Sequence, residues 1–282
     1  GEWIYPEEVG AAQTAGQTVA VGRVEKMSKS KKNTVDPQAM IERYGADTAR
    51  LFLMFAAPPH KDIEWSDSGV EGGYRFLSRI WRLVTRRLDQ LAAAGPLPDG
   101  LDSANEGLVR LVHKTIARVT DDAERRMQLN TAIAGIMELL NGMTSFDAVN
   151  GEPRNLDADG LSALRFAVET LLQLLSPFAP HLCDELWERL GHQELLEDVP
   201  WPGFDEAMLV EDTVTLAVQV QGKLRATIDV AADASQAEVE ALAFVATEID
   251  DSVTNTTTTW SSSKVATQIE AVTPPVVTNF VL

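Results

Sequence analysis

The sequence contains a single cysteine, Cys183, among its 282 residues, so no disulfide can form within the chain. No apolar run reaches the roughly 18 residues that a membrane-spanning helix needs, and the first residues do not resemble a secretory signal. The sequence also shows no internal repeat. These absences exclude a disulfide scaffold and predict a protein of the cytoplasm that does not enter a membrane.

Basic residues are scarce as well, with 24 Lys and Arg against 42 Asp and Glu and a formal net charge of -18. A chain this acidic is not expected to bind nucleic acid nonspecifically, so any polyanion site must be a local basic cluster. Metal ligands are equally sparse. His181 and Cys183 form an isolated His-x-Cys pair without further ligands at suitable spacing, so we expect no metal site and assign both residues to helix packing.

Most of the chain is predicted to be helical, which makes the expected fold class mainly α. Asp36-Pro37 is a typical helix start, Gly45 a typical stop, and Ser68 and Glu71 have capping-box spacing. Helices are therefore expected over residues 37–44, 46–57, 66–93, 103–126, 128–146 and 158–190, the last interrupted at Ser176-Pro177. In the last of these, apolar residues recur at alternating steps of three and four from Leu161 to Leu182, which is typical of a helical-bundle core.

The character of the sequence changes after residue 208, where a small α/β domain is expected. Val214 to Val220 and Leu224 to Val230 alternate in the manner of strands, with Gly222 near the turn between them. Ser235 to Val245 is predicted to form a helix. Two further strands are possible at Val265 to Val272 and Val276 to Leu282.

The segment Glu25–Asn33 reads EKMSKSKKN and concentrates four lysines within an acidic chain. Lysine ammonium groups on a mobile loop can neutralise a nucleotide triphosphate, most strongly as charge redistributes when pyrophosphate leaves. Serines supply donors and keep such a loop flexible, so that it can close over the phosphates. Lysine-rich segments in general are more often solvated basic loops. The order Lys26-Met27-Ser28-Lys29-Ser30, with Asp36-Pro37 and a helix behind it, is more specific than a lysine run.

KMSKS resembles the second signature of class I aminoacyl-tRNA synthetases. The phrases FAAPP, EWSDSGVEGGYRFLSRIWRLV, LNTAIAGIMELLN, SPFAPHLCDELW and VQVQGKLR follow in order, and the succession resembles the C-terminal part of a bacterial-type leucyl-tRNA synthetase. The resemblance runs from about Tyr5 to about Phe244. It implies a KMSKS-loop segment at the end of a catalytic domain (1–65), a helical bundle of the anticodon-binding type (66–200) and a small α/β domain that contacts tRNA (208–282).

The resemblance also implies a reaction. Leucine and ATP, with Mg²⁺, give leucyl-adenylate, and the leucyl group then passes to tRNA-Leu. Lys29 would contact the ATP phosphates as a catalytic residue, assisted by Lys26 and Ser30, within an ATP-binding segment that includes Met27 and Ser28. The other family signature, HIGH, is absent from this chain. We therefore expect a fragment that lacks its N-terminal part and catalyses neither step alone, from a parent that is usually a monomer.

Arginines recur on one face of the helix expected over 66–93, at Arg75, Arg79, Arg82 and Arg86, and Arg110, Lys114 and Arg118 repeat the pattern on the next helix. Such rows suit tRNA phosphates, although solvated faces or pairs with carboxylates are the alternative. Because four arginines share one face, contact with RNA and a solvated or paired face are about equally expected from the pattern alone. The resemblance favours contact with RNA. Lys223 and Arg225 are further candidates for tRNA contact, with ordinary hairpin residues as the alternative.

The resemblance weakens after Phe244. From Thr247 onward the sequence contains one lysine, Lys264, and four acidic residues. The Thr/Ser-rich block 254–263 does not occur in the family pattern. Two rival functions stay open at this point. One is another synthetase for a hydrophobic amino acid, such as the isoleucyl or valyl enzyme. The other is a stand-alone tRNA-binding module without chemistry, although such a module would not need KMSKS.

Overall fold

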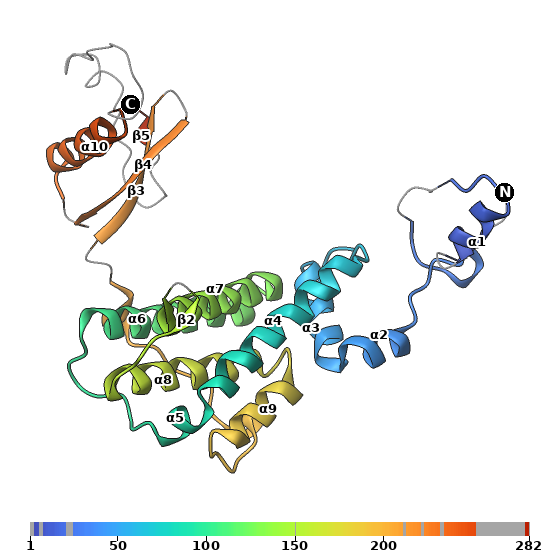
Figure 1. Cartoon of the computed structure of the whole chain (residues 1–282), viewed down its shortest axis with the longest axis horizontal. Coiled ribbons are helices and arrows are strands. Elements are labelled where there is room, and N and C mark those ends of the chain that lie inside the picture. The colour runs from blue at the N-terminus through green and yellow to red at the C-terminus, as the bar shows by residue number, and fades with distance from the viewer. Residues whose placement is uncertain are drawn as a thin grey trace. The chain divides into compact units, whose positions relative to one another are not determined.

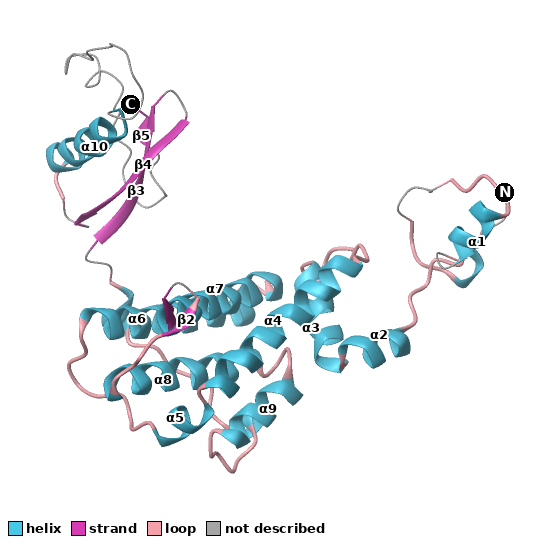
Figure 2. Cartoon of the chain, in the orientation of Figure 1, coloured by secondary structure: helices cyan, strands magenta, loops and turns pink. Residues whose placement is uncertain are grey.

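The protein is described here from a computed structural model of the whole chain. The structure describes residues 3–5, 8–20, 25–149, 151–210, 213–220, 223–231, 234–251 and 280–281. It divides into two compact units, Gly1–Asp205 and Glu206–Leu282. Figures 1 and 2 show that the first is built almost entirely from helices, whereas the second carries a small sheet. The predicted mainly-α class is confirmed.

The first unit begins with a short helix, α1 (Val9–Thr14). A single 3₁₀ turn, η2 (Lys29–Lys31), lies inside the KMSKS segment. Two helices follow, α2 (Pro37–Tyr44) and α3 (Ala46–Ala56). Asp36 starts α2 as predicted, because its side chain accepts a hydrogen bond from the amide of Gln38 at 3.0 Å. Gly45, with φ of 86°, separates α2 from α3 where a left-handed conformation is needed.

The bundle that follows is made of long helices. Its elements are α4 (Asp67–Arg86), α5 (Leu88–Ala93), α6 (Ser103–Thr120), α7 (Leu129–Asp147), α8 (Ala158–Leu175) and α9 (Pro180–Arg189). A π-helical turn, η3 (Asp121–Arg125), extends α6, and a two-stranded hairpin, β1 (Ala148–Val149) with β2 (Glu152–Pro153), follows α7. Helices α6, α7 and α8 pack against one another (Figure 1).

The predicted bundle core is largely the observed one. The positions spaced by three and four run from α8 through the turn after it into α9. Of these, the two outermost, Leu161 and Leu182, are half-buried, and the others are buried: Leu164, Val168, Leu171, Leu175 and Phe178. They join one continuous apolar cluster with residues of α4, α6 and α7. The spacing placed them on a single stripe, and burial of that stripe supplies most of the stability of a helix in a bundle.

Two predicted features of the 66–93 region are wrong. The cap of α4 is Ser66, whose hydroxyl accepts from the amide of Gly69 at 3.2 Å, and not Ser68. Glu71 instead accepts from the hydroxyl of Tyr44 at 3.3 Å. The single long helix is in fact two, because the chain leaves helical geometry at Arg87, between α4 and α5.

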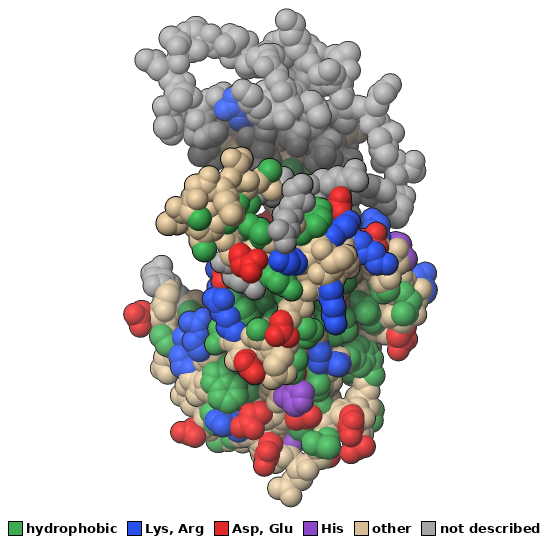
Figure 3. Space-filling view, turned by 90° about the vertical axis from the view of Figure 1, so that its right-hand side faces the viewer, with side chains coloured by type: hydrophobic (Ala, Val, Ile, Leu, Met, Phe, Trp, Pro, Cys, Tyr) green, Lys and Arg blue, Asp and Glu red, His purple; other side chains and the backbone are tan. Residues whose placement is uncertain are grey.

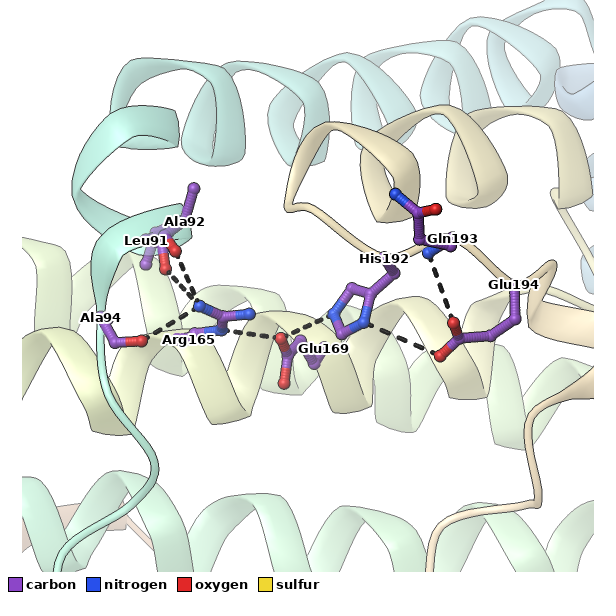
Figure 4. A network of polar contacts seen from close by, with 8 residues as sticks. All are labelled: Leu91, Ala92, Ala94, Arg165, Glu169, His192, Gln193 and Glu194. Atoms are coloured by element: carbon purple, nitrogen blue, oxygen red, sulfur yellow. Dashed lines mark hydrogen bonds and ion pairs between the residues drawn. The ribbon is translucent and has the colours of Figure 1, made fainter.

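Helix α5 is held by a side chain from α8. Arg165 donates to the carbonyls of Leu91, Ala92 and Ala94 at 3.0–3.1 Å, which satisfies acceptors that the end of a helix leaves without partners (Figure 4). Its Nε binds Glu169 at 2.8 Å, and Glu169 also binds His192 at 2.9 Å. This network ties α5, α8 and the turn after α9 together.

The second unit carries a 3₁₀ turn, η5 (Glu206–Leu209), followed by two antiparallel strands, β3 (Thr213–Val220) and β4 (Lys223–Ala231), and helix α10 (Gln236–Asp251). Val218, Ile228 and Val230 alternate onto one face and bury with Ala243 of α10. A short strand, β5 (Phe280–Val281), pairs parallel to β3. The predicted strand 265–272 and the block 254–263 lie outside the described residues.

Candidate functional site

The KMSKS segment folds as a compact turn. Ser28 is extended, Lys29–Lys31 make a 3₁₀ turn, and Lys32 has a φ of 51°, in the left-handed region that non-glycine residues enter at a cost of roughly 1–2 kcal/mol. The reversal at Lys32 brings Asn33 back toward the start of the motif. Asn33 Oδ1 accepts from the amide of Ser28 at 2.8 Å, and its Nδ2 donates to the carbonyl of Lys26 at 3.4 Å.

The four lysines of this segment fall into two pairs. Lys31 forms an ion pair with Glu25, and the ammonium of Lys32 lies 5.3 Å from the centre of the Tyr5 ring. The side chains of Lys26 and Lys29 are exposed and have no partner among the described residues. The two lysines of the motif therefore remain available to an anion, while the two that follow are engaged within the protein itself.

The other motif residues lie beside these lysines. Met27 is exposed, and the hydroxyls of Ser28 and Ser30 are 3.2 Å apart. The turn thus presents two ammonium groups and a pair of hydroxyls, which is a suitable set for a phosphate chain. The assignment of Lys26, Met27, Ser28, Lys29 and Ser30 to ATP stays a prediction.

The arginines of α4 differ in what they contact. Arg75 is exposed without a partner among the described residues, and Arg82 donates only to Ser78 of its own helix, at 3.2 Å. Arg79 donates to Asn141 of α7 at 2.8 Å. Arg86 forms an ion pair with Asp147 at the end of α7. Three of these side chains (Arg79, Arg82 and Arg86) line one open groove of about 660 Å³ with Thr144 of α7.

The basic residues of α6 are more fully paired. Arg110 binds Glu106 at 2.8 Å, and Arg118 binds Glu138 of α7. Lys114 is half-buried and has a partner as well. Pairing with carboxylates is therefore more common among the basic residues of α6 than among the arginines of α4. In Figure 3 basic side chains occur in separate groups with acidic ones between them, as the net charge of the chain leads one to expect.

Sequence reasoning missed the centre of one polar network. Asp147 is fully buried and binds Arg87 Nε at 2.8 Å in addition to Arg86. Arg87 is itself buried, donating to Gln90 at 2.9 Å and to the carbonyl of Arg154 after the hairpin. A signal was present in the sequence, because Arg87 directly follows the arginine row where an apolar residue would continue the helix.

His181 is not a packing residue, contrary to the prediction. Its side chain is 76% exposed, and Nδ1 lies 2.7 Å from Asp47 Oδ1 of α3. Cys183 is buried as predicted, and burial raises the pKa of its thiol well above the ordinary value.

The described residues contain no group of three or more His, Cys, Asp or Glu side chains that could hold a metal ion. They also contain no helix long and apolar enough to cross a membrane.

In the second unit Arg225 lies exposed on β4. Lys223 begins β4, and its side chain lies outside what the structure describes. Both stay candidates for tRNA contact.

Two family descriptions match separate parts of the chain. "Anticodon-binding domain of tRNA ligase" matches residues 105–241, and "tRNA synthetases class I (I, L, M and V)" matches residues 17–66, which include the KMSKS turn. A leucine–tRNA ligase of Geobacter sp. (strain M21) is 51% identical over 232 residues, covering 82% of this chain and 27% of that protein. One from Chromohalobacter salexigens is 50% identical over 234 residues, covering 83% and 26%.

Among solved structures, the chain is similar to the ternary complex of Agrobacterium radiobacter K84 agnB2 LeuRS-tRNA-LeuAMS. The TM-score is 0.63 with 30% identity, over 81% of this chain and 28% of that one. The chain thus spans about a quarter of the length of the curated relatives it matches.

Proposed function

The chain belongs to the leucine–tRNA ligase family, and we propose from this premise that it is the part of such an enzyme that supplies the KMSKS loop and a tRNA-binding bundle. The whole protein activates leucine with ATP and transfers it to tRNA-Leu. The observation that carries the proposal is the identity of about 50% to leucine–tRNA ligases over four fifths of the chain. The match of residues 17–66 to class I tRNA synthetases includes the turn in which the side chains of Lys26 and Lys29 have no partner among the described residues.

In this proposal Lys29 and Lys26 act on ATP, bound with Mg²⁺ as the substrate. The leucine carboxylate attacks the α-phosphorus and pyrophosphate leaves, so negative charge builds up on the departing oxygens. An ammonium group placed there stabilises the transition state more than it stabilises bound ATP, which raises the rate rather than only the affinity. Ser28 and Ser30 supply hydroxyl donors. Lys31 and Lys32 keep the turn in shape through Glu25 and Tyr5.

We further propose that the arginine row of α4 contacts tRNA phosphates, with Arg75 and Arg82 as its principal members. Their freedom from carboxylates supports this, because a guanidinium already neutralised within the protein gains less from a phosphate. Arg79 is held by a neutral amide, and Arg86 by Asp147. Arg110, Lys114, Lys223 and Arg225 are secondary candidates. The protein is proposed to work in the cytoplasm as a monomer.

The test is leucine-dependent exchange of pyrophosphate into ATP by the full-length protein that contains this chain. Exchange with leucine is expected to exceed that with isoleucine, valine or methionine by a wide margin. Equal rates with the four amino acids would overturn the leucine assignment, and an isoleucyl or valyl enzyme would then take its place. Those alternatives are not favoured, because the relatives described above are leucine–tRNA ligases. The isolated chain is expected to catalyse no exchange.

A further inference from the structure

The main chain of the KMSKS turn is closed by one side chain, that of Asn33. Its carbonyl oxygen accepts from the Ser28 amide at 2.8 Å, and its amide nitrogen donates to the Lys26 carbonyl at 3.4 Å. The two contacted residues flank Met27, so Asn33, which lies outside the motif, links the main chain on either side of Met27. The ion pair between Glu25 and Lys31 closes the same segment a second time.

Asparagine suits this position because it offers one acceptor and two donors on one short, planar group. Aspartate would accept from the Ser28 amide but could not donate to the Lys26 carbonyl, and alanine would do neither. The left-handed turn at Lys32 is what returns Asn33 to the motif, so the contact joins residues five and seven apart along the chain.

The consequence concerns the two free lysines. The carbonyl of Lys26 accepts a hydrogen bond from Asn33, and the amide of Ser28 donates one to it. Lys29 begins the 3₁₀ turn directly after Ser28. Their ammonium groups carry no restraint of their own among the described residues. Whatever order they have therefore comes from their main chain. Fixing that main chain in advance reduces the entropy lost when the lysines meet the phosphates, which is the general benefit of preorganisation.

We propose that Asn33 is a positioning residue for ATP activation, acting through Lys26 and Lys29 without touching the nucleotide itself. This inference rests on the proposed function of the KMSKS turn. It assigns to Asn33 a part of the rate of leucyl-adenylate formation. It also predicts that the contribution of Asn33 becomes smaller once one of the two lysines it positions is removed.

The experiment is a double-mutant cycle in the full-length enzyme, read by leucine-dependent pyrophosphate exchange. Asn33→Ala is expected to lower kcat at least tenfold, with KM for leucine changed less than twofold. Asn33→Asp is expected to recover none of this loss, because the carboxylate repels the Lys26 carbonyl and competes for the lysines. Gln38→Ala is the matched control outside the turn, since Gln38 bonds Glu42 on α2, and its rate should equal the parent's.

The cycle separates positioning from general destabilisation. In a Lys29→Ala background, adding Asn33→Ala should cost clearly less than it costs in the parent, because one of the two lysines that Asn33 positions is already gone, whereas a merely structural role would multiply the two losses. A wild-type rate in Asn33→Ala, or multiplied losses in the double variant, would overturn the inference while leaving the proposed function intact. A wild-type rate in Lys29→Ala would instead overturn the proposed function. Thermal unfolding followed by circular dichroism should be the same for Asn33→Ala and the parent. A large loss of stability in that variant would also count against positioning.

Discussion

Arg87 Nε donates to Asp147 Oδ1 at 2.8 Å, and both side chains are buried where α4 gives way to α5. Asp147 ends α7 some 60 residues later in the sequence, so one carboxylate fixes the ends of two helices. A charge buried without its partner is costly, and we expect Asp147→Ala to lower the free energy of unfolding by about 3–5 kcal/mol. Urea unfolding of the chain measures this. The control, Asp121→Ala, removes the exposed pair with Arg125 and should cost far less. Equal costs for the two variants would contradict the prediction.

The division of the KMSKS lysines makes a second prediction, for exchange by the full-length enzyme. Lys29→Ala should lower the leucine-dependent rate about a hundredfold, as the loss of one donor to a transition state commonly does. Lys31→Ala removes a cation of the same kind two residues later, but one that is paired with Glu25, and the rate should fall less than fivefold. A larger effect of Lys31→Ala than of Lys29→Ala would show that the wrong pair had been assigned to ATP.

A third prediction concerns tRNA binding by the α4 row. Arg75→Gln should weaken binding of tRNA-Leu severalfold and reduce the slope of log affinity against log salt by about one, as expected for the loss of one phosphate contact. Arg118→Gln is the matched control, because that guanidinium already binds Glu138. Filter binding at several salt concentrations distinguishes the two. An unchanged slope in Arg75→Gln would remove that residue from the interface.

A fourth prediction concerns pH. Partial burial lowers the pKa of His113, and the attraction of Asp205 offsets this in part. The unfolded chain therefore binds a proton at this residue more readily than the folded chain does. Stability should fall as the pH drops below the usual histidine range near 6.5. Nδ1 of His113 lies 3.2 Å from the amide of Asp205, so protonation also removes an acceptor.

The check is urea unfolding at pH 5.5 and pH 7.5, for the parent chain and for His113→Gln. The loss of stability at the lower pH should be smaller in the variant. His181→Gln is a suitable comparison, because that imidazole is largely exposed and lies beside Asp47. The same pH dependence in the parent and in His113→Gln would contradict the role given to His113.

Sequence patterns predicted features that depend on neighbours along the chain. Asp36 and Gly45 bound α2 as expected, and the buried positions of α8 follow from helical spacing alone. The capping of α4 by Ser66 was missed because Ser66 and Ser68 are both good caps, and the choice depends on where the helix enters the bundle. Local preference could not decide between two serines separated by one residue.

Features that depend on distant partners were beyond such patterns. Arg87, at the break between α4 and α5, binds Asp147, and the exposed His181 lies beside Asp47, 134 residues away. The same limit applies to the candidate sites. Spacing put four arginines on one face, yet Asn141 and Asp147 decide which of them are engaged. Within the KMSKS segment, Lys31 pairs with Glu25, which is near in sequence, whereas the contact of Lys32 with Tyr5 could not be predicted from the motif.

The left-handed main chain at Lys32 sets which amino acids that position tolerates. Glycine would adopt this conformation without penalty and asparagine with little, whereas valine, isoleucine or threonine would clash with their own backbone. Natural variation at position 32 should therefore follow backbone geometry more closely than charge. A lysine-to-glycine exchange there would preserve the left-handed main chain although it removes the contact with Tyr5, whereas a lysine-to-threonine exchange, which keeps a polar side chain, would disturb that main chain.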